Sequence, residues 1–538
     1  MSNNENNSET HFVERHPDAD KPSRFSVRKL LFILLLVGLV AAAAVWWWRK
    51  AQSQSVLQAE IDAIHARGEP VTVGEITFFR QGQLPPEQNA FTLYKQAAER
   101  FDTFAATESD RAATEPEQAD VVWALATPGK CSTCRREHAD GQAPLRALID
   151  YPVWRREHAD EASAFLTACK PALALVRQAR GMDGVPLHDP DNDRPAQSAL
   201  DELFSPRLPY VLLAARLSSL AAVMAHDAGN DRDAFEHLLD IWQIRDLLGE
   251  HPTFITVLIQ ANVTGMAAAC MEQIVPMLRI GPGPDEVHAA DVLALAERLI
   301  QSDAPLDVAR KADIGERVYL YEMARASWGE TNTSGWSLNR SARDMVLAAM
   351  LRAYPQGDEW IGSRYIGGGE PAESSTEKVS VWRWAMGLEA AAMTQGELLV
   401  ELGASTRHRG RVVAYRGLAT QRMAGLALLM RLHDVETGQP VATLDDLVPR
   451  YVDTLPEDPF SPTGDPPRLL ADDPHPRLYS LNHDQQDDGG DLTKSPDGIF
   501  TRDPRDWPYF LNDTRDQAEG RDDQPPPPAN PADSGQYR

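Results

Sequence analysis

The hydrophobic pattern of the chain begins with an uninterrupted apolar run from Leu30 to Trp48, and basic residues flank this run on both sides. A helix of about 20 apolar residues crosses the hydrocarbon core of a bilayer, and three consecutive tryptophans at its end suit the headgroup interface. We therefore predict a single transmembrane helix over residues 29–50. The polar residues 1–28 before it show no apolar period and predict a disordered cytoplasmic tail.

Basic residues near this predicted span indicate its orientation. More of them precede the span than follow it: Arg15, Lys21, Arg24, Arg28 and Lys29 come before, and Arg49, Lys50 and Arg67 come after. Basic residues favour the cytoplasmic side, so we expect a cell-membrane protein with a cytoplasmic amino terminus and a periplasmic bulk. The alanines at 41–44 leave open a cleaved signal peptide as the alternative.

Downstream of the anchor, apolar residues recur mostly at helical spacing, which predicts a helical domain over residues 51–300. Its first helix is expected at 56–66. The clearest unit is a pair of amphipathic helices over 209–248, where Gly229 is a plausible C-cap between them and a short connection predicts an antiparallel hairpin. A third helix is expected to open at Pro252.

The hydrophobic pattern after residue 300 predicts further helices and a small α+β module, so the predicted fold class is mainly α. We expect an irregular helical region with linkers at 301–378, a helical pair at 379–435, the α+β module at 436–512 and a disordered Pro/Asp-rich tail at 513–538. The two paired helices are predicted at 379–402 and 412–432. Their methionines and aromatic residues are typical of core packing rather than of a cofactor site.

Composition narrows the range of partners. The 538 residues are 43% hydrophobic and 25% charged, which is typical of a globular chain with room for two or three domains. The formal net charge of −26 would repel the phosphates of nucleic acid, and no basic run interleaved with aromatic residues offsets it. We therefore expect no nucleic-acid partner.

Four cysteines, Cys131, Cys134, Cys169 and Cys270, are compatible with disulfides outside the cytoplasm. Cys131 and Cys134 form a C-x-x-C pair and are the disulfide candidate. Redox and metal roles stay open, although a zinc site would need a second ligand pair and haem attachment would need a histidine where Arg135 stands.

An acidic loop near the carboxy terminus is the candidate metal site. Ca²⁺ takes six to eight oxygen ligands from carboxylates and carbonyls. The predicted calcium ligands are Ser480, Asp484, Asp487, Asp488 and Asp491, and two glycines accompany them. The alternative is a solvated acidic turn.

Two weaker sites come from spacing alone. Residues 189–193 alternate acids as an EF-hand loop does, but Arg194 and Leu200 occupy the positions of its glycine and its bidentate glutamate. His226, His237 and His251 lie on neighbouring predicted helices, and histidines near helix ends are usually solvated or capping residues.

The carboxy-terminal motifs carry a family resemblance. They are Gly438-Gln439-Pro440, Leu444 to Pro449, Asp458-Pro459-Phe460, Leu478 to Leu481, the acidic loop and Asp497 to Phe500. In this order they resemble the carboxy-terminal half of the major pseudopilin of type II secretion systems, which implies a helix, a small antiparallel sheet and a calcium-binding loop.

The chain departs from that family in informative ways. Asn482 and Gln485 stand where the family tends to carry glycine. The anchor has neither an acidic residue near its start nor a prepilin-peptidase site, so the resemblance indicates a module rather than a pilin. The whole layout is also similar to uncharacterised bacterial extracytoplasmic proteins, a resemblance that implies no activity.

Catalytic signatures are missing from the sequence: it has no Walker loop, nucleophile elbow, His-Glu-x-x-His motif or dinucleotide fingerprint. We therefore predict a non-catalytic scaffold or binding protein of the cell envelope with a protein partner. The alternative is an envelope hydrolase with an unrecognised active site in the helical domain.

Overall fold

The structure, a computed structural model, describes residues 27–76, 84–101, 155–156, 158–184, 208–249, 253–327, 340–354, 362, 364–365, 388–492 and 505–512. Its helices are α1 (Val27–Ala66), α7 (Ala159–Ala179), α9 (Leu208–Asp227), α10 (Asp231–Leu248), α11 (Phe254–Ile274), α12 (Ala289–Gln301), α13 (Ala304–Ser327), α14 (Arg340–Ala353) and α17 (Leu388–Thr437). Its strands are β1 (Arg468–Leu470), β2 (Arg477–Ser480) and β3 (Trp507–Phe510). The prediction of a mainly helical fold is confirmed.

The predicted hairpin is formed by α9 and α10. Gly229 has a φ of +75°, which a residue with a side chain rarely adopts, and it ends α9 as expected. The Asn230 side chain then accepts a hydrogen bond from the backbone N–H of Asp233 and caps α10. The next helix, α11, begins after the capping residue Thr253, one residue beyond Pro252.

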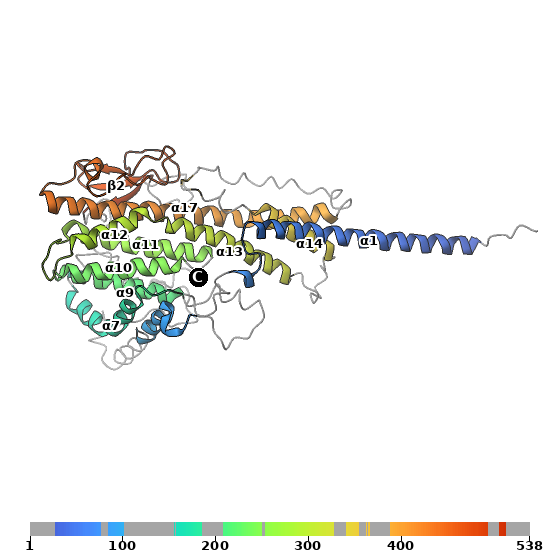
Figure 1. Cartoon of the computed structure of the whole chain (residues 1–538), viewed down its shortest axis with the longest axis horizontal. Coiled ribbons are helices and arrows are strands. Elements are labelled where there is room, and N and C mark those ends of the chain that lie inside the picture. Colours follow the sequence, from blue (N-terminus) through green and yellow to red (C-terminus); the bar gives the residue numbers. More distant parts are fainter. Residues whose placement is uncertain are drawn as a thin grey trace, which may run out of the picture.

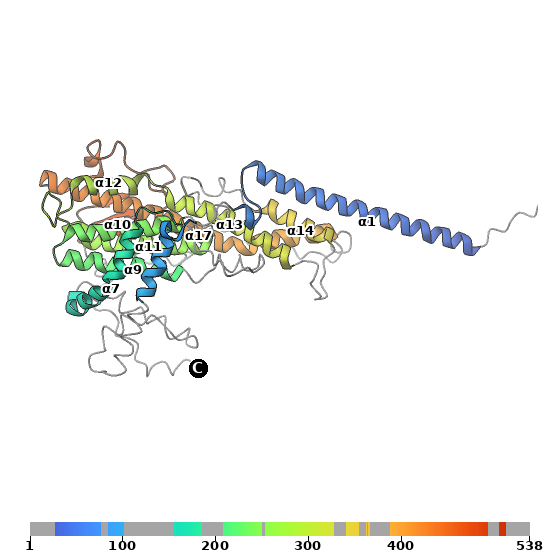
Figure 2. The same ribbon diagram turned by 60° about the horizontal axis from the view of Figure 1, so that its bottom comes forward.

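Helices α9 to α12 and the carboxy-terminal half of α17 lie side by side and form the body of the molecule (Figures 1 and 2), with α7 against α9. One large apolar core joins them. The body is therefore held chiefly by helix-on-helix burial of aliphatic side chains.

Helix α17 is a single helix of 50 residues where the sequence predicted a pair. Gly410, in the expected break, lies within the helix. Its lack of a side chain makes room for the Phe254 ring, since a Cβ there would come within 2.6 Å of that ring. The neighbouring guanidiniums of Arg407 and Arg411 stack on Tyr354 and Tyr365. Local polarity suggested a loop, but tertiary contacts stabilise the helix there.

Helix α1 is likewise continuous over 40 residues, so the predicted membrane span and the helix expected at 56–66 are one element. The described apolar side chains between Leu30 and Trp48 are 45–68% exposed, whereas Ser53 is only 2% exposed. Figure 1 shows this helix extending away from the body. The other helix apolar and long enough to span, α11, is mostly buried in the body.

The region expected to be irregular, 301–378, contains α13 and α14. Both helices pack against α17, and α14 also lies along the carboxy-terminal half of α1. Their apolar stripes are short and find partners only in the assembled fold, which explains why the sequence pattern was weak.

The carboxy-terminal strands form an antiparallel sheet in the order β1-β2-β3, with Leu478 opposite both Leu469 and Tyr509. The sheet rests on α17 beside the body. Trp507 Nε1 donates to Thr420 Oγ1 over 2.8 Å, and the N–H of Phe510 donates to Glu272 of α11 over 3.0 Å. The sheet is therefore docked on the body by polar contacts as well as by apolar packing.

Candidate functional site

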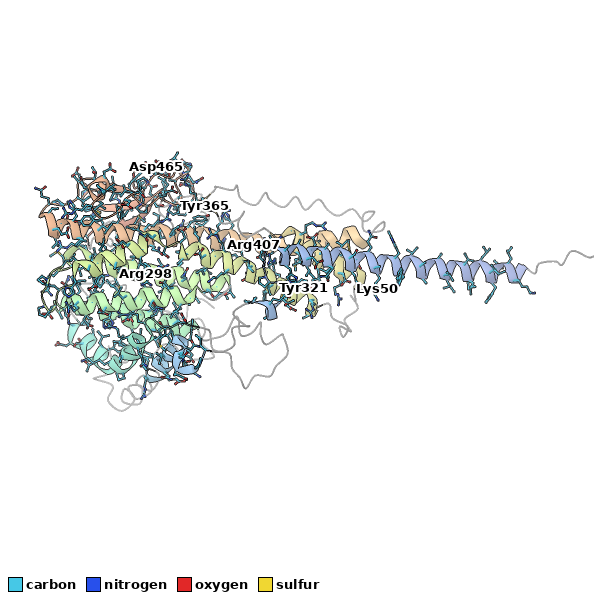
Figure 3. The ribbon with its side chains drawn as sticks, viewed as in Figure 1. Lys50, Arg298, Tyr321, Tyr365, Arg407 and Asp465 are labelled. Atoms are coloured by element: carbon cyan, nitrogen blue, oxygen red, sulfur yellow. The ribbon has the colours of Figure 1, made fainter. Side chains whose placement is uncertain are left out.

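The most unusual chemistry of the described residues lies where α1 meets the body. We call this region the anchor joint: the carboxy-terminal half of α1, residues 67–76, α13, α14 and the part of α17 around Arg407. It has a separate small apolar core, formed by Ile64, Val71, Tyr321, Ala324, Leu347, Met350, Leu351 and Tyr354. Figure 3 labels Lys50, Tyr321 and Arg407 along this end of the molecule.

Arg317 of α13 ties the segment after α1 to the joint. Its Nη1 lies 2.5 Å from Glu69 Oε2, and its Nη2 donates to the Pro70 carbonyl over 3.0 Å. Burial by itself would raise the pKa of Glu69, but hydrogen bonds from Arg67 and Arg317 outweigh it and lower the pKa. Glu69 is therefore held as a carboxylate that pairs with a buried guanidinium.

Asp313 is the most perturbed carboxyl group of the joint. It is 1% exposed, and burial raises its pKa to about 7, although Arg407, Tyr354 and Arg317 act in the opposite direction. Its Oδ1 accepts no hydrogen bond of good geometry from the part of the chain that the structure describes. Burial therefore places the pKa of this carboxyl group close to neutral pH, far above that of an exposed aspartate.

The groups around Asp313 enclose it. Glu316, one helical turn along α13, also has its pKa raised by burial, and it accepts a hydrogen bond from the N–H of Phe254 over 3.4 Å. Arg407 Cζ lies 4.8 Å from the centre of the Tyr354 ring, and burial raises the pKa of Tyr354 well above its ordinary value. The cluster is enclosed by helices, so its chemistry suits proton uptake inside a joint rather than contact with a substrate.

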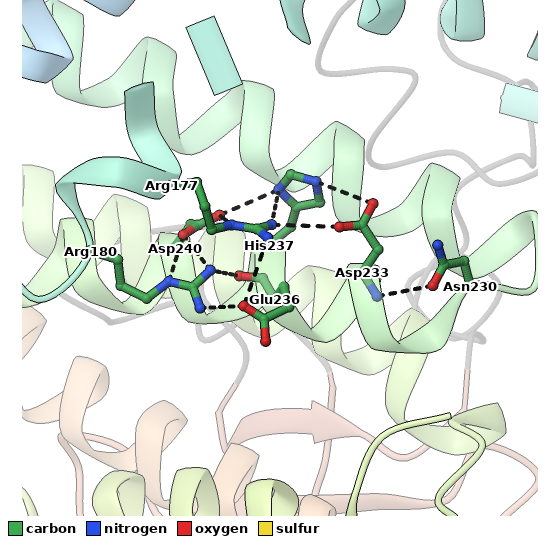
Figure 4. Close-up of polar contacts among 7 residues, drawn as sticks. All are labelled: Arg177, Arg180, Asn230, Asp233, Glu236, His237 and Asp240. Carbon is green, nitrogen blue, oxygen red and sulfur yellow. Dashed lines mark hydrogen bonds and ion pairs between the residues drawn. The ribbon is translucent and has the colours of Figure 1, made fainter. Parts of the chain in front are cut away.

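A second network fastens α7 to α10 (Figure 4). Arg177 of α7 and Arg180, which caps that helix, lie 2.8 and 2.6 Å from the carboxylate of Asp240, and Arg180 also pairs with Glu236 at 2.5 Å. Burial would raise the pKa of Asp240, but His237 and the two arginines lower it overall. Each charged side chain of this network pairs with another of its members, so the network serves to hold α7 against α10.

Of the predicted histidines, the structure describes His226 and His237, and these two bind different aspartates. His226 Nδ1 lies 2.6 Å from Asp231 Oδ1, at the end of α9, whereas His237 faces Asp233 and Asp240. Each is bound to aspartates of its own helix pair. His251, residues 189–193 and the pair Cys131 and Cys134 lie outside the described residues. Cys169 and Cys270 are buried thiols, and the Cys270 Sγ donates to the Ser219 carbonyl over 3.8 Å.

The predicted calcium loop has two distinct halves. The Ser480 hydroxyl donates to Asp458 Oδ1 over 2.6 Å. The same carboxylate also accepts hydrogen bonds from the N–H groups of Phe460 and Leu481. Ser480 is therefore directed at a buried aspartate that the sequence prediction did not include. These hydrogen bonds fasten the end of β2 to the segment around Asp458.

The acidic half lies nearer the surface. Asp487 pairs with Arg468 at 2.8 Å and accepts from the Tyr479 hydroxyl, Asp488 pairs with Arg505 at 3.3 Å, and Asp484 accepts from the N–H of Gln486. Among the described residues, no three His, Cys, Asp or Glu side chains are arranged to hold a metal ion. Calcium binding by Ser480, Asp484, Asp487, Asp488 and Asp491 stays a prediction.

Asp506 is the acidic residue of this region that sequence reasoning missed. It is buried directly before β3 and accepts from the N–H of Gly490 over 2.7 Å. Burial raises its pKa to about 7, and Asp487, Asp488 and Asp484 add to the effect. The available signal in the sequence was an aspartate directly before the apolar residues Trp507 to Phe510. It was missed because Asp506 is far along the chain from the acidic loop that it contacts.

Comparison with known proteins adds no assignment to this geometry. The chain matches no protein-family model, no curated protein and no solved structure.

Proposed function

We propose that the chain is a membrane-anchored scaffold or binding protein of the cell envelope, with its body held at a set position relative to the bilayer. The observation that carries this proposal is the continuity of α1. The exposed apolar half ends at Trp48, and the buried position Ser53 follows five residues later in the same helix. A membrane-inserted α1 would connect directly to the body without a flexible linker.

The packing of the joint supports a rigid connection. Ile64 lies in the small apolar core with α13 and α14, and Arg352 of α14 pairs with Glu60 of α1 at 2.5 Å. No proline or glycine interrupts α1 between Val40 and Ala66. Such a connection suits a protein that presents surfaces to a partner at a fixed height above the membrane.

The carboxy-terminal sheet is proposed as a pseudopilin-like module. Asn482 and Gln485, at the positions where that family tends to carry glycine, both have a φ of +60°. Their side chains are used for docking: Asn482 Oδ1 accepts from Arg416 of α17 over 2.9 Å, and Gln485 Nε2 donates to the Tyr365 carbonyl over 2.8 Å. The positive φ at both positions is the conformation that glycine adopts readily, which supports the resemblance. The docking contacts of the two side chains account for Asn and Gln in place of glycine.

Topology is the first test of the proposed function. Protease added to spheroplasts should digest the body of the full chain but leave it intact in whole cells and in inverted vesicles. Sequencing of the mature amino terminus should show that Leu30 to Trp48 is retained. A body recovered as a soluble protein cut near Ala44 would support the signal-peptide alternative and remove the anchor from the proposal.

The scaffold role is tested by making the connection flexible. A short Gly/Ser insertion after Lys50 should leave the protein in the membrane and folded but should abolish crosslinks between the body and its envelope partner. The matched control is the same insertion after Gly438, which lies beyond α17. Crosslinks that survive the first insertion unchanged would contradict a fixed position above the membrane.

A further inference from the structure

The buried guanidinium of Arg245, near the end of α10, has unused hydrogen-bonding capacity. Arg245 is completely buried, and within the described residues its Nε, Nη1 and Nη2 donate no hydrogen bond of good geometry. The indole Nε1 of Trp242 is also buried, and it likewise donates no hydrogen bond within the described residues. Arg245 Cζ lies only 4.9 Å from the centre of the Trp242 ring. Unused donors of two side chains therefore lie together in the core.

The charges around Arg245 do not balance. Asp246 Oδ1 lies 3.1 Å from Arg245 Nε, but the second oxygen of the same carboxylate binds Arg298 of α12. Two guanidiniums therefore share one carboxylate. Burial lowers the pKa of Arg245 to about 10, which leaves the group charged at neutral pH. An uncompensated buried charge is strongly destabilising, and so is a buried donor without an acceptor.

We propose that Arg245 and Trp242 form a binding site for a small monovalent anion, with the ion accepting hydrogen bonds from the Arg245 Nη atoms and the Trp242 indole. One negative charge balances the excess of one guanidinium. Complete burial of Arg245 favours a small ion such as chloride or a short carboxylate such as formate. Asp246 and Arg298 are about one-third exposed and connect the site to the surface, which gives the ion a route of entry.

The surrounding backbone is fixed in a way that suits a permanent site. Gln260 of α11 donates from Nε2 to the Arg245 carbonyl over 3.2 Å and so ties the end of α10 to α11. Gly249 caps the end of α10 and lies close against α13, since a Cβ there would come within 2.8 Å of the Val308 side chain. These contacts hold the end of α10 against α11 and α13 and so fix the position of the Arg245 backbone.

The test is thermal unfolding of the full chain in detergent, at constant ionic strength, as sodium gluconate is replaced by sodium chloride or sodium formate. Gluconate is too large for a buried site, so a site of this kind predicts a saturable rise of about 2–5 °C in the unfolding midpoint. The two arms distinguish a halide from a carboxylate. A midpoint that is equal in all three salts would overturn the proposal.

Variants locate the effect. Arg245→Met should fold and lose the anion dependence, whereas the exposed control Arg352→Met should keep it. If Arg245→Met does not fold, Trp242→Phe serves instead, because it keeps the ring beneath the guanidinium and removes only the indole N–H. Trp242→Phe should need a higher anion concentration for the same rise. An unchanged response in both variants that fold would show that the ion binds elsewhere.

Discussion

The body and the anchor joint are built from the same kind of helix but are held together differently. The body buries many aliphatic side chains in one large core, whereas the described residues of the joint have a separate small cluster of eight buried apolar residues, Tyr354 among them, beside Glu69, Asp313, Arg317 and Arg407. Apolar packing is insensitive to protonation, but buried charges depend on both pairing and pH. The stability of the joint should therefore depend on pH, and the joint lies next to the exposed apolar half of α1.

The largest expected effect is in the body. Leu418→Ala removes a fully buried side chain from α17, and it should destabilise the protein by about 3–5 kcal/mol through lost burial and a residual cavity. Chemical denaturation of the full chain measures this change. The matched control is Leu258→Ala at a half-exposed position of α11, which should have a much smaller effect. Equal effects would contradict a close-packed body.

Next comes the loss of pairing in the joint. Glu69→Gln leaves the buried guanidinium of Arg317 without its carboxylate and should destabilise the joint by roughly 1–3 kcal/mol. The effect should be local, so hydrogen exchange should accelerate in residues 60–76 and in α13 while the α9–α10 hairpin stays protected. Uniform acceleration throughout the chain would show that the joint and the body unfold as one unit.

A pH effect is expected from Asp313, and its size grows with the width of the pH range. Because its pKa is raised in the folded state, its contribution to stability is complete below the ordinary aspartate pKa and is lost as the pH rises to about 7. The charged groups facing it are Arg317 and Glu316 on α13 and Arg407 on α17, and the Tyr354 hydroxyl, directly after α14, also faces it. Asp313→Asn removes this titration.

The difference between the two proteins isolates the effect. Between about pH 4 and 7 the stability of Asp313→Asn relative to the natural chain should rise by up to roughly 1.4 kcal/mol per pH unit. Urea denaturation at a series of pH values measures it. Parallel stability curves would mean that Asp313 does not take up a proton on folding.

The smallest effect is expected at the surface of the joint. Glu60→Gln breaks the pair with Arg352, whose side chain is half exposed, and should change stability by less than about 1 kcal/mol. The same denaturation experiment checks it. A loss as large as that of Glu69→Gln would show that this pair, rather than the buried Arg317, fastens α1 to the body.

The comparison also shows what the sequence could predict. The α9–α10 hairpin was predictable because its signals are local: two apolar stripes and a glycine at the turn. The joint was not, because Glu69 and Arg317 are 248 positions apart along the chain. No periodicity within one helix indicates a partner at that distance.

The helix breaks illustrate the same limit. The sequence predicted two helices with a gap between residues 402 and 412, whereas contacts of this segment with Phe254, Tyr354 and Tyr365 accompany one continuous helix. In the acidic loop, Asp484, Asp487 and Asp488 were visible in the sequence as a cluster. Their arginine partners and the buried Asp506 became apparent only in the fold.

The sequence by itself determined the helical class, the apolar anchor segment and the main hairpin, because hydrophobic periodicity and capping residues act within a few turns of one helix. The tertiary structure decided the continuity of α1 and α17, the enclosure of Asp313 and the unpaired donors of Arg245. These features depend on burial and on partners from distant segments. Burial sets the pKa of a carboxyl group and the charge balance of a guanidinium, and burial exists only once the helices have packed together.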